Sequence, residues 1–120
     1  MQSRKFDLEE RLIDFGVLII EASEKLPKTA AGKHLADQLL RSGTAPALLY
    51  GEAQAAESKK DFIHKLEIAY KEARETRYWL RLLNKSGLLE NNMSASYISE
   101  CEEIMKILSA ILNTSKGNGN

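Results

Sequence analysis

Apolar residues recur in alternating steps of four and three residues through four stretches of this 120-residue chain. The first of these stripes consists of Leu8, Leu12, Phe15, Ile19, Ala22 and Leu26. On an α-helix such spacing collects the residues on one face, where they can form a core. The composition agrees, because Ala, Leu, Glu and Lys, all good helix formers, dominate it. Connections of only a few residues force consecutive helices antiparallel. The sequence therefore predicts an all-α, antiparallel up-down-up-down four-helix bundle.

The residue types near the helix ends predict where the first and third helices begin and end. The first helix begins around residues 6 to 8 and ends before Pro27, because proline disfavours helical geometry in the residue that precedes it. The third opens at Ser58, whose hydroxyl can cap the first free amides. It ends at Gly87, a suitable residue for a left-handed cap.

The second helix starts after the turn at residues 29–32 and runs to about Ala56. Gly43 and Pro46 interrupt it, and proline removes one helical hydrogen bond. We therefore expect a kink in the second helix near these two residues. Two separate helices are the alternative.

The fourth helix is predicted to begin near Ser94 or Ser96. A chain of this length suits one domain. We expect residues 1–114 to form the bundle and residues 115–120 to form a disordered C-terminal tail.

No run approaches the roughly 18 apolar residues of a membrane span, and no signal peptide is recognisable. The single Cys101 excludes an intramolecular disulfide. From the missing signal peptide and the missing membrane span we expect a cytoplasmic protein without membrane contact.

The charge balance bears on possible partners. Seventeen basic and 17 acidic residues give a net charge of zero. A dedicated nucleic-acid binder usually carries a basic excess, because contacts to phosphate supply much of its affinity. A neutral protein also lacks the repulsion that helps to keep chains apart, so the balance favours self-association.

Several helices carry more apolar residues than one core stripe needs. The surplus can widen the core of a monomer, or it can be buried against another subunit. The zero net charge favours a subunit interface and hence a homo-oligomer. The candidate interface residues are Ile13, Val17, Ile20, Ile63, Tyr70, Tyr78 and Trp79.

Five segments of the two central helices carry a family resemblance: residues 38–45 (QLLRSGTA), 50–53 (YGEA), 58–62 (SKKDF), 65–73 (KLEIAYKEA) and 75–80 (ETRYWL). With them, roughly residues 6 to 112 resemble the four-helix bundle or 23S rRNA intervening-sequence proteins. The resemblance implies a small bacterial bundle that forms a pentamer. The accessory protein of diversity-generating retroelements is similar more distantly, and it engages nucleic acid and a reverse transcriptase. That relative is strongly basic, whereas this chain is neutral.

Polar residues on the inner half of the second helix and on the third helix form one candidate site. Arg41 could grip a phosphate or carboxylate ligand. Alternatively it could pair with an acidic side chain of its own chain and fix the helix register or a subunit contact. The candidate residues are Arg41, Ser42, Glu52, Glu72 and Glu75.

A second candidate is a basic stripe on the third helix, which could bind RNA or DNA when repeated around a ring. Tyr70, Tyr78 and Trp79 could stack on bases there, or they could belong to the core or interface. Glu67 could instead pair with a lysine four residues later and make the stripe an ordinary solvated face. The stripe consists of Lys71, Arg74, Arg77, Arg81 and Lys85.

The sequence offers little for catalysis. A di-iron bundle needs Glu-x-x-His on two helices, whereas His64 and Glu67 occur once in the reverse order. No phosphate-binding glycine loop or nucleophile motif is recognisable. We therefore predict a non-enzyme without metal, cofactor or small-molecule substrate. Its expected role is a homo-oligomeric interaction or assembly module for itself and another protein, with nucleic-acid binding as the alternative.

Overall fold

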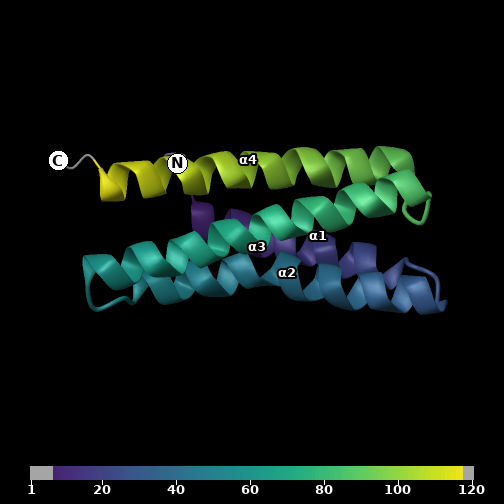
Figure 1. Cartoon of the computed structure of the whole chain (residues 1–120), viewed down its shortest axis with the longest axis horizontal. Coiled ribbons are helices and arrows are strands. Elements are labelled where there is room, and N and C mark those ends of the chain that lie inside the picture. Colours follow the sequence, from purple (N-terminus) through teal and green to yellow (C-terminus); the bar gives the residue numbers. More distant parts are fainter. Residues whose placement is uncertain (1–6, 118–120) are drawn as a thin grey trace, which may run out of the picture.

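The computed structural model describes residues 7–117, which form four helices joined by short turns (Figure 1). The helices are α1 (Leu8–Glu24), α2 (Ala30–Gln54), α3 (Lys59–Ser86) and α4 (Asn91–Lys116). No strand occurs within this part of the chain. The predicted all-α four-helix fold is therefore confirmed. Successive helices run in alternating directions along the long axis (Figure 1).

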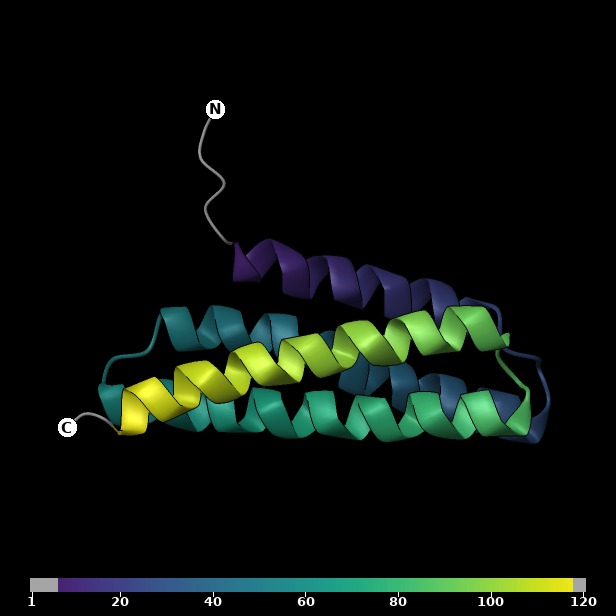
Figure 2. The ribbon, with the colours of Figure 1, turned by 90° about the horizontal axis from the view of Figure 1, so that it is seen from above.

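The four helices are not equally embedded. α3 packs along both α2 and α4, and α1 packs along α2 but meets α4 over only a small area. No Cα atom of α1 lies within 8 Å of a Cα atom of α3. They lie at diagonal corners of the bundle, with α1 behind in Figure 1 and at the opposite side from α3 in Figure 2. Their outer faces therefore point away from each other.

Side-chain caps begin the helices where the sequence places the best capping residues. Asp7 accepts a hydrogen bond from the Glu10 amide at 3.1 Å and begins α1. The Ser58 hydroxyl accepts from the Asp61 amide at 3.0 Å, as predicted for α3. Gly87 ends α3 with φ of +78°, a conformation that residues with a Cβ rarely adopt. Each cap satisfies backbone groups that the helix itself leaves free.

The fourth helix begins earlier than predicted. It starts at Asn91 rather than near Ser94 or Ser96, because the Glu90 carboxylate accepts from the Met93 amide at 2.9 Å. α4 also continues to Lys116, two residues into the segment expected to be tail, where Lys116 pairs with Glu67 at 2.8 Å. Residues 118–120 of that tail lie outside the described residues.

Helix α2 is one continuous helix, so the alternative of two separate helices is wrong. Pro46 lies inside it and is buried together with Gly43. The hydrogen bond that the proline ring removes does not end the helix, because apolar contacts continue on both sides. The kink itself stays a prediction.

The core contains the stripe that the sequence predicts. Every member of the first stripe is buried, and α3 contributes Leu66, Leu80 and Leu83 with no exposure at all. α1 and α2 come close together at Gly43, where a Cβ atom would meet two Ile19 side-chain carbons at 2.7 Å. The missing side chain lets α1 and α2 come together there.

Candidate polar network and assembly surfaces

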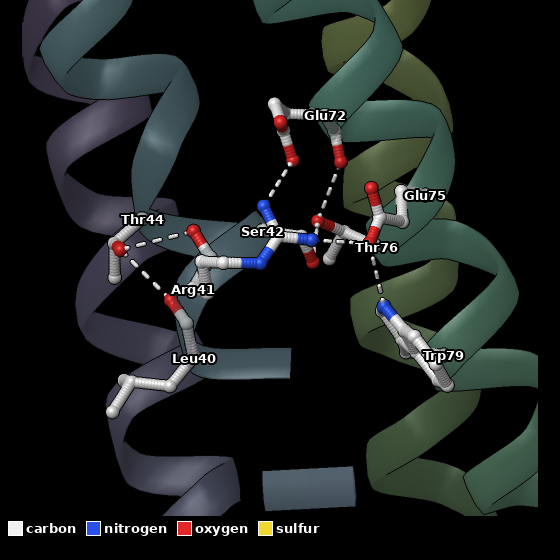
Figure 3. A network of polar contacts seen from close by, with 8 residues as sticks. All are labelled: Leu40, Arg41, Ser42, Thr44, Glu72, Glu75, Thr76 and Trp79. Carbon is white, nitrogen blue, oxygen red and sulfur yellow. Dashed lines mark hydrogen bonds and ion pairs between the residues drawn. The ribbon is translucent and has the colours of Figure 1, made fainter. Parts of the chain in front are cut away.

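The polar candidates on α2 and α3 meet across the interface between these helices (Figure 3). Glu72 and Glu75 lie three residues apart on α3 and therefore share the side that faces α2. The Arg41 guanidinium reaches from α2 and donates to Glu72 Oε1 at 3.0 Å and to Glu75 Oε2. Trp79 Nε1 also donates to Glu75 Oε2 at 3.3 Å. One arginine thus bridges two carboxylates of the neighbouring helix.

The exposure of these groups limits what the ion pairs contribute. The Arg41 side chain is 51% exposed, whereas Glu72 and Glu75 are 16% and 32% exposed. Water screens much of the attraction, although the forked geometry favours an arginine. Glu52, the other candidate partner, pairs with Lys65 at 2.9 Å instead. The network is a clamp between α2 and α3 at the protein surface.

A buried pair of hydroxyl groups lies beside this clamp. Ser42 and Thr76 are fully buried, and their oxygen atoms lie 2.8 Å apart. The Thr76 hydroxyl also lies 2.8 Å from the Glu72 carbonyl oxygen. Each hydroxyl has one proton, so both donors are used when Ser42 donates to Thr76 and Thr76 donates to that carbonyl. The pair connects α2 to α3 through the core.

We expect Arg41→Ala to lower the free energy of unfolding by about 1 kcal/mol. The change leaves Glu72 and Glu75 facing each other without their shared cation. Arg41→Lys should recover only part of the loss, because an ammonium group cannot fork to two carboxylates. Urea unfolding measures the effect. The matched control is Lys65→Ala, which removes the single ion pair between Lys65 and Glu52. Unchanged stability in Arg41→Ala would contradict a structural role and favour a ligand contact.

The structure divides the basic stripe of α3 into two groups. Arg77 turns toward α4, where its Nε lies 3.1 Å from Glu102 Oε2. That geometry makes an ion pair but no well-directed hydrogen bond, and the buried Nε has no other acceptor among the described residues. The other four members are exposed: Lys71, Arg74, Arg81 and Lys85.

Acidic residues of α3 do not neutralise the exposed part of the stripe. Glu72 and Glu75 face α2 and contact Arg41. Glu67 does not pair with Lys71, as the sequence suggested, but with Lys116 of α4 at 2.8 Å. The reason is that α4 runs alongside α3 and brings its last turn to Glu67. The exposed cations therefore keep their charge on the surface.

Tyr78 lies among these cations and is 46% exposed. The guanidinium carbons of Arg77 and Arg81 lie 5.7 and 5.6 Å from its ring centre, within cation–π range. A hydrogen bond from Arg74 lowers the pKa of the Tyr78 hydroxyl. The surface here combines an aromatic ring with positive charge.

The candidate interface residues fall into two classes. Ile63, Tyr70 and Trp79 are partly buried and pack against the core. The Trp79 ring packs edge-to-face with the His34 ring, with 6.3 Å between the ring centres. In contrast, the other four residues are each about 45% exposed: Ile13, Val17, Ile20 and Tyr78. Three exposed leucines were not predicted: Leu40, Leu48 and Leu82. Leu82 was detectable, because it follows Tyr78 by four residues on the same helix face.

Cys101 lies in the core. Its Sγ is fully buried at 3.1 Å from the Ala73 carbonyl oxygen, and burial raises the pKa of the thiol from 9.0 to about 12. At pH 8 a thiol with this pKa is about a thousandfold less ionised than a thiol with a pKa of 9.0. The thiolate is the form that reacts. We expect iodoacetamide to alkylate the folded protein at least a thousandfold more slowly than the urea-unfolded protein, as followed by mass spectrometry. Similar rates would contradict the burial.

The same thiol affects stability at high pH. Above pH 9 the unfolded chain loses the Cys101 proton while the folded chain keeps it, so the folded state binds more protons. The free energy of unfolding should therefore fall as the pH rises from about 9 toward 12.

Two further properties of residues 7–117 bear on function. No cluster of three or more His, Cys, Asp or Glu side chains in this range could hold a metal ion. None of the four helices is both long and apolar enough to cross a bilayer.

Known proteins resemble this chain in sequence and in fold. Residues 4–110 match the model of the family described as 23S rRNA-intervening sequence protein. The chain belongs to this family. The resemblance that the motifs of α2 and α3 indicated is therefore confirmed. No curated protein matches the chain.

The crystal structure of a protein from the S23 ribosomal protein family shows the same fold. That protein, of unknown function, comes from Bacteroides thetaiotaomicron VPI-5482, and its crystal structure is at 1.70 Å. Its TM-score is 0.83 at 35% sequence identity, and the match covers 88% of this chain and 98% of the other. Neither the family description nor this relative indicates an enzymatic activity.

Proposed function

We propose that this member of the family is a non-catalytic homo-oligomer, a pentamer of helical bundles that acts as an assembly or interaction module. The observation that carries the proposal is the stripe of Ile13, Val17 and Ile20 along α1. These side chains follow one another by four and three residues, and each is 43–45% exposed in the single chain. A row of branched apolar side chains in water favours burial against another subunit. The number five comes from the family resemblance.

The arrangement of charged groups supports a non-catalytic role. Arg41, the strongest candidate for a ligand contact, has its donors directed at Glu72 and Glu75. Cys101 is enclosed by the core and keeps its proton at neutral pH. These groups serve the fold in the single chain, which leaves the outer faces of the helices as the functional surface.

Native mass tests the proposal. Light scattering on a sizing column should give a mass near five times the 13.5 kDa of the chain. Ile13→Ser with Val17→Ser should lower that mass and leave the helical circular dichroism unchanged, because both side chains are exposed in the single bundle. A wild-type mass of 13.5 kDa at micromolar concentration would refute the homo-oligomer.

One observation favours a second function, binding of RNA or DNA. Lys71, Arg74, Arg81 and Lys85 are exposed, whereas the acidic residues between them, Glu72 and Glu75, face α2 and pair with Arg41. Four cations on one helix face could contact successive phosphates. The chain should then retard labelled RNA on a gel at about 50 mM salt, and Arg74→Glu with Arg81→Glu should abolish the shift. Absence of binding at this low salt would exclude the second function, since phosphate contacts are strong there.

A further inference from the structure

The outer surface of α1 carries charge of a single sign. Eight residues of this helix are exposed, and none of them is basic. Arg11, the basic residue of α1, turns away and pairs with Glu100 of α4 at 2.7 Å. The surface therefore has five acidic and three apolar side chains, and we call it the acidic face. It consists of Glu9, Glu10, Ile13, Asp14, Val17, Ile20, Glu21 and Glu24.

The outer surface of α3 between residues 71 and 85 has the opposite character. Six residues are exposed there, four basic and two apolar or aromatic. Tyr78 and Leu82, the two residues without charge, are 46% and 52% exposed. We call this the basic face. It consists of Lys71, Arg74, Tyr78, Arg81, Leu82 and Lys85.

The two faces also match in length. At 1.5 Å per residue the acidic face, from residue 9 to residue 24, is about 22 Å long, and the basic face, from 71 to 85, is about 21 Å. Each combines exposed apolar side chains with charges of one sign. Two such helix faces can bury their apolar side chains together while their charges attract at the rim.

The bundle keeps the two faces of one chain apart. α1 and α3 lie at diagonal corners, and no Cα atom of one helix comes within 8 Å of a Cα atom of the other (Figure 2). The charge on each face is therefore not compensated by the other inside the same chain. Contact between two acidic faces, or between two basic faces, would bring like charges together. A symmetric dimer through either face is thus disfavoured, whereas a head-to-tail contact is favoured.

We propose that the acidic face of one copy docks on the basic face of the next, so that identical head-to-tail contacts close into a ring. The inference rests on the homo-oligomer proposed above and assigns the surfaces that form it. The exposed apolar residues of α1 then pack on Tyr78 and Leu82. In the ring the basic face is covered by protein and is not free for nucleic acid.

Charge reversal tests the pairing. The acid-reversed variant carries Asp14→Lys and Glu21→Lys, and the base-reversed variant carries Arg74→Glu and Arg81→Glu. Each should dissociate to 13.5 kDa by light scattering while the wild type stays assembled. The swap variant combines all four changes and should reassemble, because every contact again joins opposite charges.

Matched controls reverse charges outside both faces. Asp37→Lys with Glu57→Lys alters two exposed acidic residues, and Lys28→Glu with Lys106→Glu alters two exposed lysines. Both controls should keep the wild-type mass. Circular dichroism verifies that each variant remains helical.

The outcomes separate this inference from the function on which it rests. A monomeric wild type refutes the homo-oligomer and this pairing with it. An assembled wild type with reversed variants that also stay assembled refutes only the pairing. A folded swap variant that stays dissociated refutes the charge complementarity. A base-reversed variant that loses RNA binding but keeps its mass would show that the basic face serves nucleic acid instead.

Discussion

Gly43→Ala is expected to destabilise the bundle by about 2 kcal/mol, although alanine favours helix by about 1 kcal/mol. The new Cβ would lie 2.7 Å from two carbons of Ile19. Ile19 is fully buried and branched at Cβ, so it cannot rotate away without disturbing its neighbours. The remaining response is to move α1 away from α2, which costs contacts along the whole interface. Urea unfolding at one fixed protein concentration measures the loss.

Gly51 provides the matched control for this substitution. It lies on the same helix, but a Cβ there meets nothing within 4 Å. Gly51→Ala should therefore raise the free energy of unfolding by roughly 0.5–1 kcal/mol. The cost of Gly43→Ala should shrink when Ile19→Ala is already present. Additive losses in the double variant would contradict direct contact as the cause.

Thr76→Val is expected to lower the free energy of unfolding by about 2 kcal/mol while keeping the shape of the core. The change removes the hydroxyl beside Ser42 and leaves the buried Ser42 group without its partner. A polar group that is buried and unsatisfied costs more than the lost bond contributed.

Ser42→Ala should restore much of that stability in the double variant, because it removes the unsatisfied group. The same denaturant titrations give a double-mutant cycle for the pair. A loss below about 0.5 kcal/mol in Thr76→Val, or a double variant less stable than Thr76→Val alone, would contradict the buried hydroxyl pair.

Local sequence signals were sufficient for the helices and most of the core. The three-four spacing predicted the buried stripes because a helix face is determined by residue spacing alone. Ser58 and Gly87 were recognisable as caps because their chemistry acts within a few residues. The start of α4 was missed because the cap is Glu90, an uncommon capping residue that accepts a hydrogen bond from the Met93 amide, whereas a serine was expected.

The candidate sites were less predictable, because their partners lie far apart in the chain. The residue types around Arg41 were recognised, but the sequence did not choose among Glu52, Glu72 and Glu75. Packing of α2 on α3 brings Glu72 and Glu75 to the Arg41 guanidinium. Glu52 instead pairs with Lys65. Glu67 likewise lies within reach of Lys71 in sequence yet pairs with Lys116 on another helix.

The sequence by itself determined the helical class, the four apolar stripes and the family of this protein, because these depend on spacing and on local motifs. Only the tertiary structure decided which surplus apolar residues stay exposed. It turned Ile63, Tyr70 and Trp79 toward the core and left Ile13, Val17 and Ile20 outside. It also placed the acidic and basic faces at opposite corners. The physical reason is that exposure depends on which helices become neighbours, and helix order around a bundle is not encoded in the period of any one helix.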